Sequence, residues 1–596
     1  MPKYLPVRQR LTPWLVVFGL LASPWLAAQS LALSKGQARI SLLAINDMHG
    51  NILPPSIPVW VADPQNPAGK RLNAGGAAFM ATLIGKFQAQ NPTGTLVVGA
   101  GDLVGATPLA SGLFHDEPAV EVLNYLGLNL TSVGNHEFDK GTQELLRLQS
   151  GGCFPANADG TAGVVGKDTC MRDGQFAGAT FQYLAANVIV KATGKPLFPG
   201  YAMREMDGIK VGFIGLTLRD TPSMVIPAGV QSVQFVDEVQ TINSLVPELK
   251  QQGAAFIVLL IHQGGMTTAR FAQDPSCPGF SGDIVGIADK LDPAVALIVS
   301  GHTHQEYVCT RPDGRLITQS GYYGRLLTKI DVVVDRQSGA ILSKEARNHV
   351  VVNDRNNPPD TGDYAPLAAD PQLSALVARY GDLSATMADI VVGRIAAPLL
   401  RQASPAGEST LGALIADAFL TGASAPQGGH PGAQIALVGP GGIRGELSSS
   451  LSVTFGQLFS VIPFANNLIS MDLTGAQIVR VLEQQWEGKT GNGQIMAVSQ
   501  GFSYTWDASA PSGAAPGQGR RVVPGSLMLD GKPMSMDATY RVVVDTFIAG
   551  GGDRFTVFKQ GKNRVTGELD SAVLKLYFRM KPVVHVPTLG RVLRIN

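Results

Sequence analysis

The 596-residue chain has few charged residues and almost no net charge. Asp, Glu, Lys and Arg make up only 16% of the residues, and the mean hydropathy is +0.13, which excludes a disordered or highly charged protein. The formal net charge is +1, so the chain lacks the excess of basic residues that is typical of nucleic-acid-binding proteins. We therefore expect no nucleic-acid polymer as a partner. The length allows two or three domains with large cores.

The sequence also lacks a hydrophobic run that is long enough to anchor the mature chain in a membrane. The apolar stretch at residues 14–28 is short and contains Pro24, whereas a membrane-spanning helix needs roughly 20 apolar residues. Basic residues precede this stretch and small residues follow it, which indicates a cleaved signal peptide over residues 1–30. No cysteine lies near the expected cleavage site, so we do not expect a lipoprotein anchor. We therefore predict an unanchored protein that is secreted across the inner membrane into the periplasm.

Cysteine is scarce, with four in the whole chain. An even number in an exported protein favours disulfides, and four cysteines allow three connectivities. We predict Cys153–Cys170 and Cys277–Cys309, because each bond closes a short loop. The alternative is four buried thiols, which an oxidising compartment disfavours.

What the sequence does contain is a repeated pattern over residues 38–350, in which a short apolar run ends in a polar cluster. The five pairs are "RISLLAI" with "NDMHGN", "TLVVGA" with "GDLVG", "NLTSV" with "GNHEFD", "FIVLLI" with "HQGG", and "ALIVS" with "GHTHQ". Apolar runs of this kind are typical of buried strands, and helical stretches lie between them, which predicts an α/β fold. Ligands bind at the carboxyl ends of the strands in such sheets, so we expect the five clusters to converge.

The second half of the chain predicts a separate, smaller α/β domain. Residues 351–370 are polar and rich in proline, and a helical pattern follows them. We predict a first domain over residues 37–352, a linker with a bridging helix over 353–389, and a second domain over 390–596.

Five of the nine histidines lie in the strand-end clusters, together with two aspartates and one asparagine. They are His49, His136, His262, His302 and His304, with Asp47, Asp102 and Asn135. A single histidine after a strand is more often structural than a ligand, but five clusters in order are hard to explain in that way. Imidazole, carboxylate and amide ligands suit ions such as Zn, Mn, Co, Ni or Fe. A pair of such ions clamps a phosphoryl group and activates water, and a carboxylate is suited to bridge the ions.

These clusters resemble the calcineurin-like metallophosphoesterase signature. "GESTLGALIADAF", "GPGGIRGEL", "PFANN", "GFSYTW" and "FIAGGGDRF" in the second half extend the resemblance to the 5'-nucleotidase/UDP-sugar hydrolase family, from about residue 38 to the end. The resemblance implies an N-terminal metallophosphoesterase α/β sandwich and a C-terminal nucleotide-binding domain.

The resemblance also implies a role for each polar residue of the clusters. Two divalent metal ions are expected, the first held by Asp47, His49 and His304, the second by Asn135, His262 and His302, with Asp102 as the bridge. His136 matches the catalytic histidine rather than a ligand, and Asp139 would orient its imidazole. Glu137 is expected to be structural, and Asp139 alternatively serves as an acidic residue in the first turn of a helix.

The second domain would supply the substrate contacts. Phe464 and Phe547 match two aromatic residues that sandwich the nucleobase, although core packing is the default role of a Phe in an apolar run. The remaining matches are a phosphate-binding arginine and three base or ribose contacts: Arg444, Asn466, Gly501 and Asp553.

The chain departs from the family pattern in three places. Gly439 stands where many members have asparagine, and Pro405 to Gly407 stand where many have arginines. His304 stands where some members have glutamine, which should not remove the site because imidazole is a good metal ligand. The missing arginines leave the preferred length of the phosphate chain open.

We therefore predict an exported, metal-dependent phosphoric monoester hydrolase that acts on 5'-nucleotides. One alternative keeps the chemistry but changes the substrate, as in a 2',3'-cyclic-nucleotide phosphodiesterase/3'-nucleotidase or a UDP-sugar hydrolase. A second alternative is a nucleotide-binding surface protein with a vestigial site, and a third is a purely structural periplasmic protein.

Overall fold

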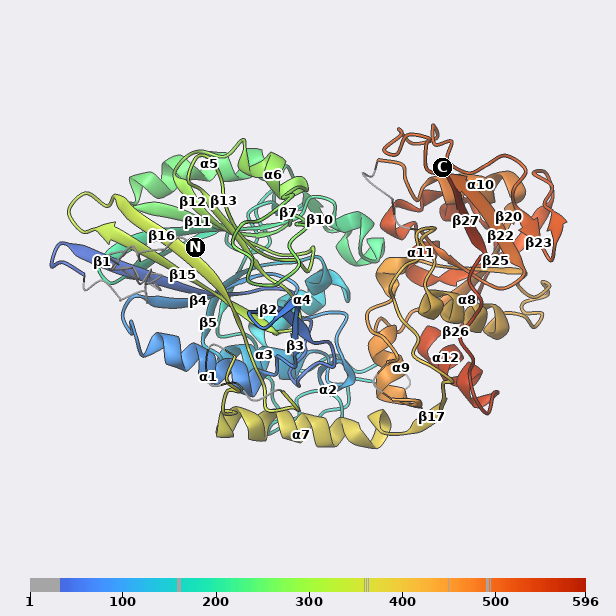
Figure 1. The fold of residues 1–596 in the computed structure, drawn as a ribbon, viewed down its shortest axis with the longest axis horizontal. Coiled ribbons are helices and arrows are strands. Elements are labelled where there is room, and N and C mark those ends of the chain that lie inside the picture. Colours follow the sequence, from blue (N-terminus) through green and yellow to red (C-terminus); the bar gives the residue numbers. More distant parts are fainter. Residues whose placement is uncertain are drawn as a thin grey trace, which may run out of the picture.

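The computed structural model describes residues 33–157, 162–357, 360, 362, 364–448, 450–488, 493 and 495–596 (Figure 1). The predicted signal peptide over residues 1–30 lies outside this range. Among the described residues, no helix has the length and apolar character needed to cross a membrane.

The N-terminal half contains two six-stranded sheets that pack face to face. In spatial order, the first sheet is β16 (Ile341–Val350), β15 (Leu326–Asp335), β1 (Gln37–Ile45), β4 (Thr95–Ala100), β5 (Leu128–Ser132) and β6 (Gln182–Leu184). The second is β13 (Glu306–Thr310), β14 (Leu316–Ser320), β12 (Val295–Ser300), β11 (Phe256–His262), β9 (Ile209–Thr217) and β8 (Tyr201–Met206). Buried Leu42 and Val98 of the first sheet share one apolar core with Val258 and Val299 of the second. This arrangement confirms the predicted α/β sandwich.

The strands that precede the polar clusters run parallel to one another. In the first sheet β1, β4, β5 and β6 are parallel, and in the second β9, β11, β12 and β14 are parallel. Their carboxyl ends therefore meet along one edge of the sandwich, where ligands bind in sheets of this kind.

Helices cover the outer faces of both sheets. The first sheet is covered by α1 (Ala77–Gln88), α3 (Glu117–Tyr125) and α4 (Thr142–Ser150), and the second by α5 (Glu238–Gln251) and α6 (Asp283–Ala288). The smaller elements are the hairpin of β2 (Val59–Asp63) and β3 (Asn66–Leu72), the helix α2 (Leu109–Gly112), and the strand pair β7 (Val188–Val190) and β10 (Val233–Phe235). The short helical turns of this half are η1 (His136–Phe138), η2 (Thr221–Ser223) and η3 (Pro227–Val230).

The expected bridging helix is α7 (Pro371–Ala388), which runs along the bottom of the view in Figure 1. The Asp370 carboxylate caps its start by accepting a bond from Leu373 N at 2.8 Å. Its buried face, with Leu373 and Tyr380, joins the core under α1 and α3. The domain boundaries remain a proposal, and the position of α7 between the two halves supports them.

The C-terminal half contains a five-stranded and a four-stranded sheet. The first has the order β21 (Ala497–Val498), β18 (Ile435–Val438), β25 (Thr539–Asp545), β20 (Asn467–Thr474) and β26 (Lys562–Leu569), and the second β24 (Lys532–Pro533), β23 (Met528–Leu529), β22 (Phe502–Asp507) and β27 (Val592–Ile595). The helices are α8 (Thr410–Gly422), α9 (Phe455–Val461), α10 (Gly475–Glu483), α11 (Thr546–Ala549) and α12 (Asp570–Arg579). The remaining elements are the strand pair β17 (Val391–Arg394) and β19 (Ser452–Thr454), and the short turns η4 (Pro440–Gly442), η5 (Gly552–Arg554) and η6 (Thr556–Gln560).

All four cysteines form disulfides in the predicted pairs. The Cα atoms of Cys153 and Cys170 are 5.3 Å apart, and those of Cys277 and Cys309 are 5.4 Å apart. The first bond closes the loop that follows α4, and the second ties the loop before α6 to β13.

Candidate metal centre and nucleotide cavity

The polar clusters converge at the carboxyl edge of the sandwich, on strained backbone. Five side chains of the predicted centre sit at non-glycine residues with positive φ, between +47° and +74°: Asp47, His49, Asp102, His302 and His304. Such conformations cost of order 1–3 kcal/mol each and persist only where the surrounding fold enforces them. Their concentration at one edge points to a functional site.

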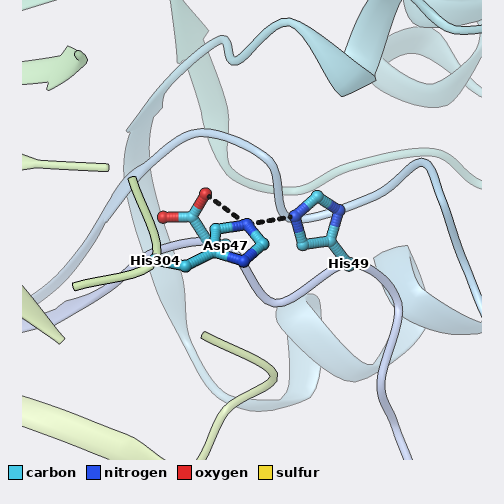
Figure 2. Close-up of side chains that lie close together, drawn as sticks. All are labelled: Asp47, His49 and His304. Atoms are coloured by element: carbon cyan, nitrogen blue, oxygen red, sulfur yellow. Dashed lines mark hydrogen bonds and ion pairs between the residues drawn. The ribbon is translucent and has the colours of Figure 1, made fainter. Parts of the chain in front are cut away.

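Asp47, His49 and His304 form the first group, and the three side chains point toward one another (Figure 2). His304 Nε2 lies 3.1 Å from His49 Nε2 and 3.4 Å from Asp47 Oδ1. His49 Nδ1 lies 2.9 Å from the Gly105 carbonyl, which only accepts, so Nδ1 carries the proton. The lone pair of neutral His49 is therefore on Nε2 and faces the group, as in metal-binding histidines.

Asp102, His262 and His302 form the second group, and Asn135 lies beside it. His262 Nε2 is 3.0 Å from Asp102 Oδ2, while its Nδ1 donates to the Ala100 carbonyl at 2.7 Å. Asn135 Oδ1 is 3.2 Å from His302 Nδ1. Asp102 Oδ2 is also 3.8 Å from His49 Nε2, so its carboxylate lies between the two groups.

The chemistry of this donor set fits divalent metal ions. The buried His262 Nε2 lies 3.0 Å from Asp102 Oδ2, so an imidazole nitrogen and a carboxylate oxygen face each other inside the protein. Burial lowers the pKa of His302 to about 3 and also lowers the pKa of His49 and His304, so these imidazoles are neutral and offer lone pairs. Neutral imidazoles around buried carboxylates are typical metal ligands.

His136 lies at the edge of the centre and is paired with Asp139. Its Nδ1 is 2.9 Å and 3.0 Å from the two Asp139 oxygens, and Asp139 Oδ2 also accepts from Ala106 N at 3.1 Å. Burial opposes the imidazolium, but the Asp139 and Asp102 carboxylates together outweigh burial and raise the pKa of His136. The ring packs against His49 at 5.0 Å, and one atom of His136 lies within 4.8 Å of His49 and Asp102 ligand atoms. With Nδ1 held by Asp139, Nε2 is the atom available to the centre.

Glu137 holds two of the strand-end loops together, in line with the structural role expected for it. Its carboxylate accepts bonds from Gly134 N at 2.6 Å, Leu103 N at 2.8 Å and Asp102 N at 2.9 Å. Burial raises the pKa of Glu137 to about 7, and the nearby Asp102 carboxylate adds to this shift. A Cβ at Gly134 would lie 2.2 Å from Asp102 Oδ1, which explains the glycine in "GNHEFD".

A cavity of about 420 Å³ lies between the two halves and reaches the centre. Predicted residues that line it include Asn135, His136, Asp139 and His302 from the first half, and Arg444, Phe464, Asn466, Phe547 and Asp553 from the second. The Phe464 ring stacks toward His136 with centroids 5.7 Å apart. Gly501 is not among the lining residues; it has φ +85° in the turn before β22, and a Cβ there would lie 2.5 Å from Asp530 Oδ1.

The cavity also has walls that sequence patterns did not single out. Met224, Val225 and Ile226 come from the loop between η2 and η3, and Asp545 lies at the end of β25. The only sequence signal for these four residues is that they lie near turns, and residues in many loops have that feature. A Cβ at Gly439 would lie 2.9 Å from Ile548 Cδ1, so a side chain at this position would require the Ile548 side chain to shift.

Arg444 lines the nucleotide cavity and also contacts the first group, which consists of Asp47, His49 and His304. Its Nη2 lies 3.2 Å from His49 Nε2, and its carbonyl accepts a bond from the Tyr323 hydroxyl at 3.1 Å. Its buried Nε has no hydrogen-bond partner among the described residues. The guanidinium is therefore placed to meet an anion at the centre.

Comparisons with known proteins agree with this arrangement. A family model for the 5'-nucleotidase C-terminal domain matches residues 391–560. Endonuclease YhcR of Bacillus subtilis is 29% identical over 533 residues, a match that covers 89% of this chain and 39% of that protein. Cell wall protein Lmo0130 of Listeria monocytogenes is 30% identical over 549 residues, which cover 88% of this chain and 65% of that protein. The chain thus spans less than two thirds of the length of these two relatives.

A solved structure extends the agreement to both halves of the fold. The crystal structure of the 5'-nucleotidase precursor from Thermus thermophilus superposes with a TM-score of 0.71 at 27% identity, covering 94% of this chain and 100% of that chain. The match includes the N-terminal sandwich and the C-terminal half together. With the matched C-terminal domain and relatives of this name, it shows that the chain belongs to the 5'-nucleotidase family.

Proposed function

We propose that this protein is a metal-dependent hydrolase that releases inorganic phosphate from 5'-nucleotides. The observation that carries the proposal is the meeting of a His- and Asp-rich centre with an aromatic cavity at His136 and Arg444. The centre would cleave the phosphate ester, and the cavity would bind the nucleoside.

Two divalent ions, such as Zn, Mn or Co, are proposed at the centre. Asp47, His49 and His304 would hold the first ion and Asn135, His262 and His302 the second, with Asp102 between them. When bound, the ions supply positive charge to the phosphoryl group and lower the pKa of water. The placement of Asp102 Oδ2 near both His49 and His262 supports its bridging role.

His136 and Asp139 are proposed to act on the leaving group. The Asp139 carboxylate holds His136 Nδ1, which orients the ring and favours its protonated form. Protonated His136 would stabilise charge on the phosphoryl oxygens or on the departing 5'-oxygen through Nε2. The leaving oxygen finally gains a proton and the free nucleoside departs.

The C-terminal half is proposed to bind the nucleoside. Phe464 and Phe547 would stack on the base, Asn466 and Asp553 would contact the base and ribose, and Arg444 would pair with phosphate. Gly501 was also predicted to contact the substrate, but it is not among the residues that line the cavity. A rotation of the two halves would carry the nucleotide to the centre.

The cellular location and the alternative activities are further parts of the proposal. Export to the periplasm is proposed from the signal-peptide pattern alone, and the two disulfides suit an oxidising compartment. Cyclic nucleotides, 3'-nucleotides and UDP-sugars remain alternative substrates, and a vestigial nucleotide-binding protein is the non-enzymatic alternative.

Phosphate release from AMP tests the proposal. The purified protein is stripped with a chelator and assayed without metal and with added Mn or Zn. We expect release only after metal addition. No release with any metal, from AMP or from the alternative substrates, together with retained nucleotide binding would instead support the vestigial protein.

A further inference from the structure

His304 is held at the metal centre in a different way from two of the other imidazoles. His49 Nδ1 lies 2.9 Å from the Gly105 carbonyl. His262 Nδ1 lies 2.7 Å from the Ala100 carbonyl. Such a bond fixes the tautomer and the ring plane of an imidazole ligand. No hydrogen bond to His304 Nδ1 is present in the part of the chain that the structure describes, because the polar contacts of its ring are made by Nε2.

The surroundings of His304 leave its ring plane to be set by another contact. Its side chain is 23% exposed, whereas those of His49 and His262 are fully buried. His304 borders an open cavity of about 390 Å³, so protein atoms do not enclose it on every side. The torsion that turns an imidazole ring has a broad distribution, and torsional preference alone therefore does not fix the ring.

The ring of Tyr322 packs flat against His304. The two ring centroids are 4.8 Å apart, and the ring planes differ by 19°. Aromatic pairs at this separation attract each other beyond the area that they bury. The Tyr322 hydroxyl makes no hydrogen bond to the described residues, so the contribution of this side chain to the centre is its ring face.

Arg325 holds the Tyr322 ring in turn. The guanidinium carbon lies 3.9 Å from the centroid of that ring, in a cation–π contact. Arg325 Nη1 donates to the Pro58 carbonyl at 2.9 Å, and its Nη2 lies 3.3 Å from Glu306 Oε1. Its Nε donates to the carbonyl of Tyr322 itself at 3.1 Å. The side chain is 3% exposed, so the guanidinium is a fixed support for the ring.

Backbone hydrogen bonds place Tyr322 beside the centre independently of its side chain. Gly321 N donates to the Gln305 carbonyl at 2.9 Å, and Tyr323 N donates to the Asp47 carbonyl at 2.8 Å. The loop between β14 and β15 is thereby tied to two of the strand-end loops. A replacement of the Tyr322 side chain therefore removes the ring contact and leaves the backbone in place.

We infer that Tyr322, held by Arg325, is a positioning residue for His304. Ring stacking here takes the place of the carbonyl hydrogen bond that orients His49 and His262. The inference rests on the proposed metal centre and adds to it a support outside the ligand set. A ring that is oriented before the ion arrives loses less conformational freedom on binding, so the stack contributes to metal affinity.

Metal affinity tests the inference. The affinity of the chelator-stripped protein for Zn²⁺ is measured by competition with a chromophoric chelator in wild type, Tyr322→Leu and Tyr322→Phe. We expect the affinity for one Zn²⁺ to fall about tenfold in Tyr322→Leu, the lower end of the usual effect of losing an outer contact. Tyr322→Phe keeps the ring and should stay within about twofold of wild type. Tyr125→Leu changes an exposed tyrosine of α3 and serves as the matched control.

The absorption spectrum of the Co²⁺-loaded protein reports the ligand geometry directly. We expect the spectrum of Tyr322→Leu to differ from that of wild type and the spectrum of Tyr322→Phe to match it. Arg325→Lys is a second test that leaves the tyrosine in place. Lysine keeps the charge but lacks the flat guanidinium, so the Zn²⁺ affinity should fall in the same direction.

These measurements separate failure of the positioning role from failure of the proposed function. Equal Zn²⁺ affinity in wild type, Tyr322→Leu and Arg325→Lys overturns the positioning role. A loss in Tyr322→Phe as large as that in Tyr322→Leu overturns it as well, because the hydroxyl and not the ring would then be required. Absence of AMP hydrolysis by the wild type overturns the proposed function, while the expected affinity loss still supports the positioning role. A wild type that binds no Zn²⁺ overturns both.

Discussion

At the scale of single residues, the candidate centre is defined by side chains that the fold holds in costly conformations. Asp47, His49 and Asp102 adopt φ near +50°, in the region that asparagine, aspartate and histidine visit more readily than most residues. Each of these turns follows a buried strand, so the strand pairing supplies the energy that keeps the backbone strained. The residue types that tolerate the conformation are also the ones that bind metal.

The role of His136 is tested by His136→Ala. Because its Nδ1 is held by Asp139 and it is not a proposed ligand, we expect the variant to retain the metals of the wild type. Turnover of AMP should fall about 10²- to 10⁴-fold, the usual contribution of a positioned acid–base group. Metal content is measured by mass spectrometry, and His585→Ala, an exposed histidine, serves as the control. Loss of metal from His136→Ala would show that this histidine is a ligand.

The role of Phe547 is tested by comparing two substrates. Phe547→Ala removes one proposed stacking surface, which is worth roughly 1–3 kcal/mol per base. We expect kcat/KM for AMP to fall about tenfold or more relative to kcat/KM for p-nitrophenyl phosphate, which carries no base. Equal losses on both substrates would mean that Phe547 supports the fold of α11 rather than the base.

At the scale of secondary-structure elements, the site depends on hydrogen bonds that hold the loops at the ends of the strands in place. Glu137 ties the loop after β4 to the loop after β5 through backbone N–H groups on both. Asp570 plays a similar part in the C-terminal half, since it accepts bonds from Asn466 N at 3.2 Å and Ser571 N at 2.6 Å. It thereby connects the start of α12 with the segment that precedes β20.

Asp570 should make stability depend on pH. Burial, and then the nearby Asp545 carboxylate, raise the pKa of Asp570 from 3.8 to about 7. A raised pKa means that the folded state binds the proton more tightly, so this contribution is full below pH 4 and is lost as pH rises to about 7. We expect the free energy of unfolding of Asp570→Asn, relative to wild type, to rise from pH 4 to about pH 7 and to level off above it. Urea titrations at several pH values measure it, and parallel curves for the two proteins would contradict the pKa shift.

At the scale of the whole molecule, the nucleotide cavity exists only because the two halves meet. Contacts that cross between them include Arg444 with His49, Phe464 with His136, and Arg554 with Asp220. The last pair is exposed, and Arg554 Nε lies 3.0 Å from Asp220 Oδ2. Arg554 directly follows Asp553, which lines the nucleotide cavity. Asp220 begins the loop that supplies Met224 to the wall of the same cavity.

Breaking this ion pair should loosen the halves without unfolding either. Exposed pairs contribute only about 0–1 kcal/mol, so Asp220→Asn should shift Tm by no more than a few degrees. We expect KM for AMP to rise about two- to fivefold, because the closed arrangement becomes less populated. Asp207→Asn breaks the exposed Arg336 pair within the N-terminal half and serves as the matched control. An identical KM in the two variants would show that the Asp220 pair has no part in closure.

Much of the fold was predictable because its signals are local. The apolar runs before "GDLVG" and "GHTH" became β4 and β12, and the helical pattern at 371–389 became α7. Both disulfide pairs follow from short loops. The cavity wall formed by Met224, Val225 and Ile226 was not predictable, because these side chains line the cavity only through neighbours from distant segments.

The sequence by itself determined the α/β class, the family, and the polar side chains that follow each strand. These depend on hydrophobic periodicity and on residue types at fixed spacings, which a linear chain carries in full. Only the tertiary structure decided that Asp102 lies between two histidine groups, that Arg444 reaches His49 from the other half, and that Gly501 is not among the residues lining the cavity. Those facts arise from the packing of segments far apart in the chain, and no local pattern specifies such distances.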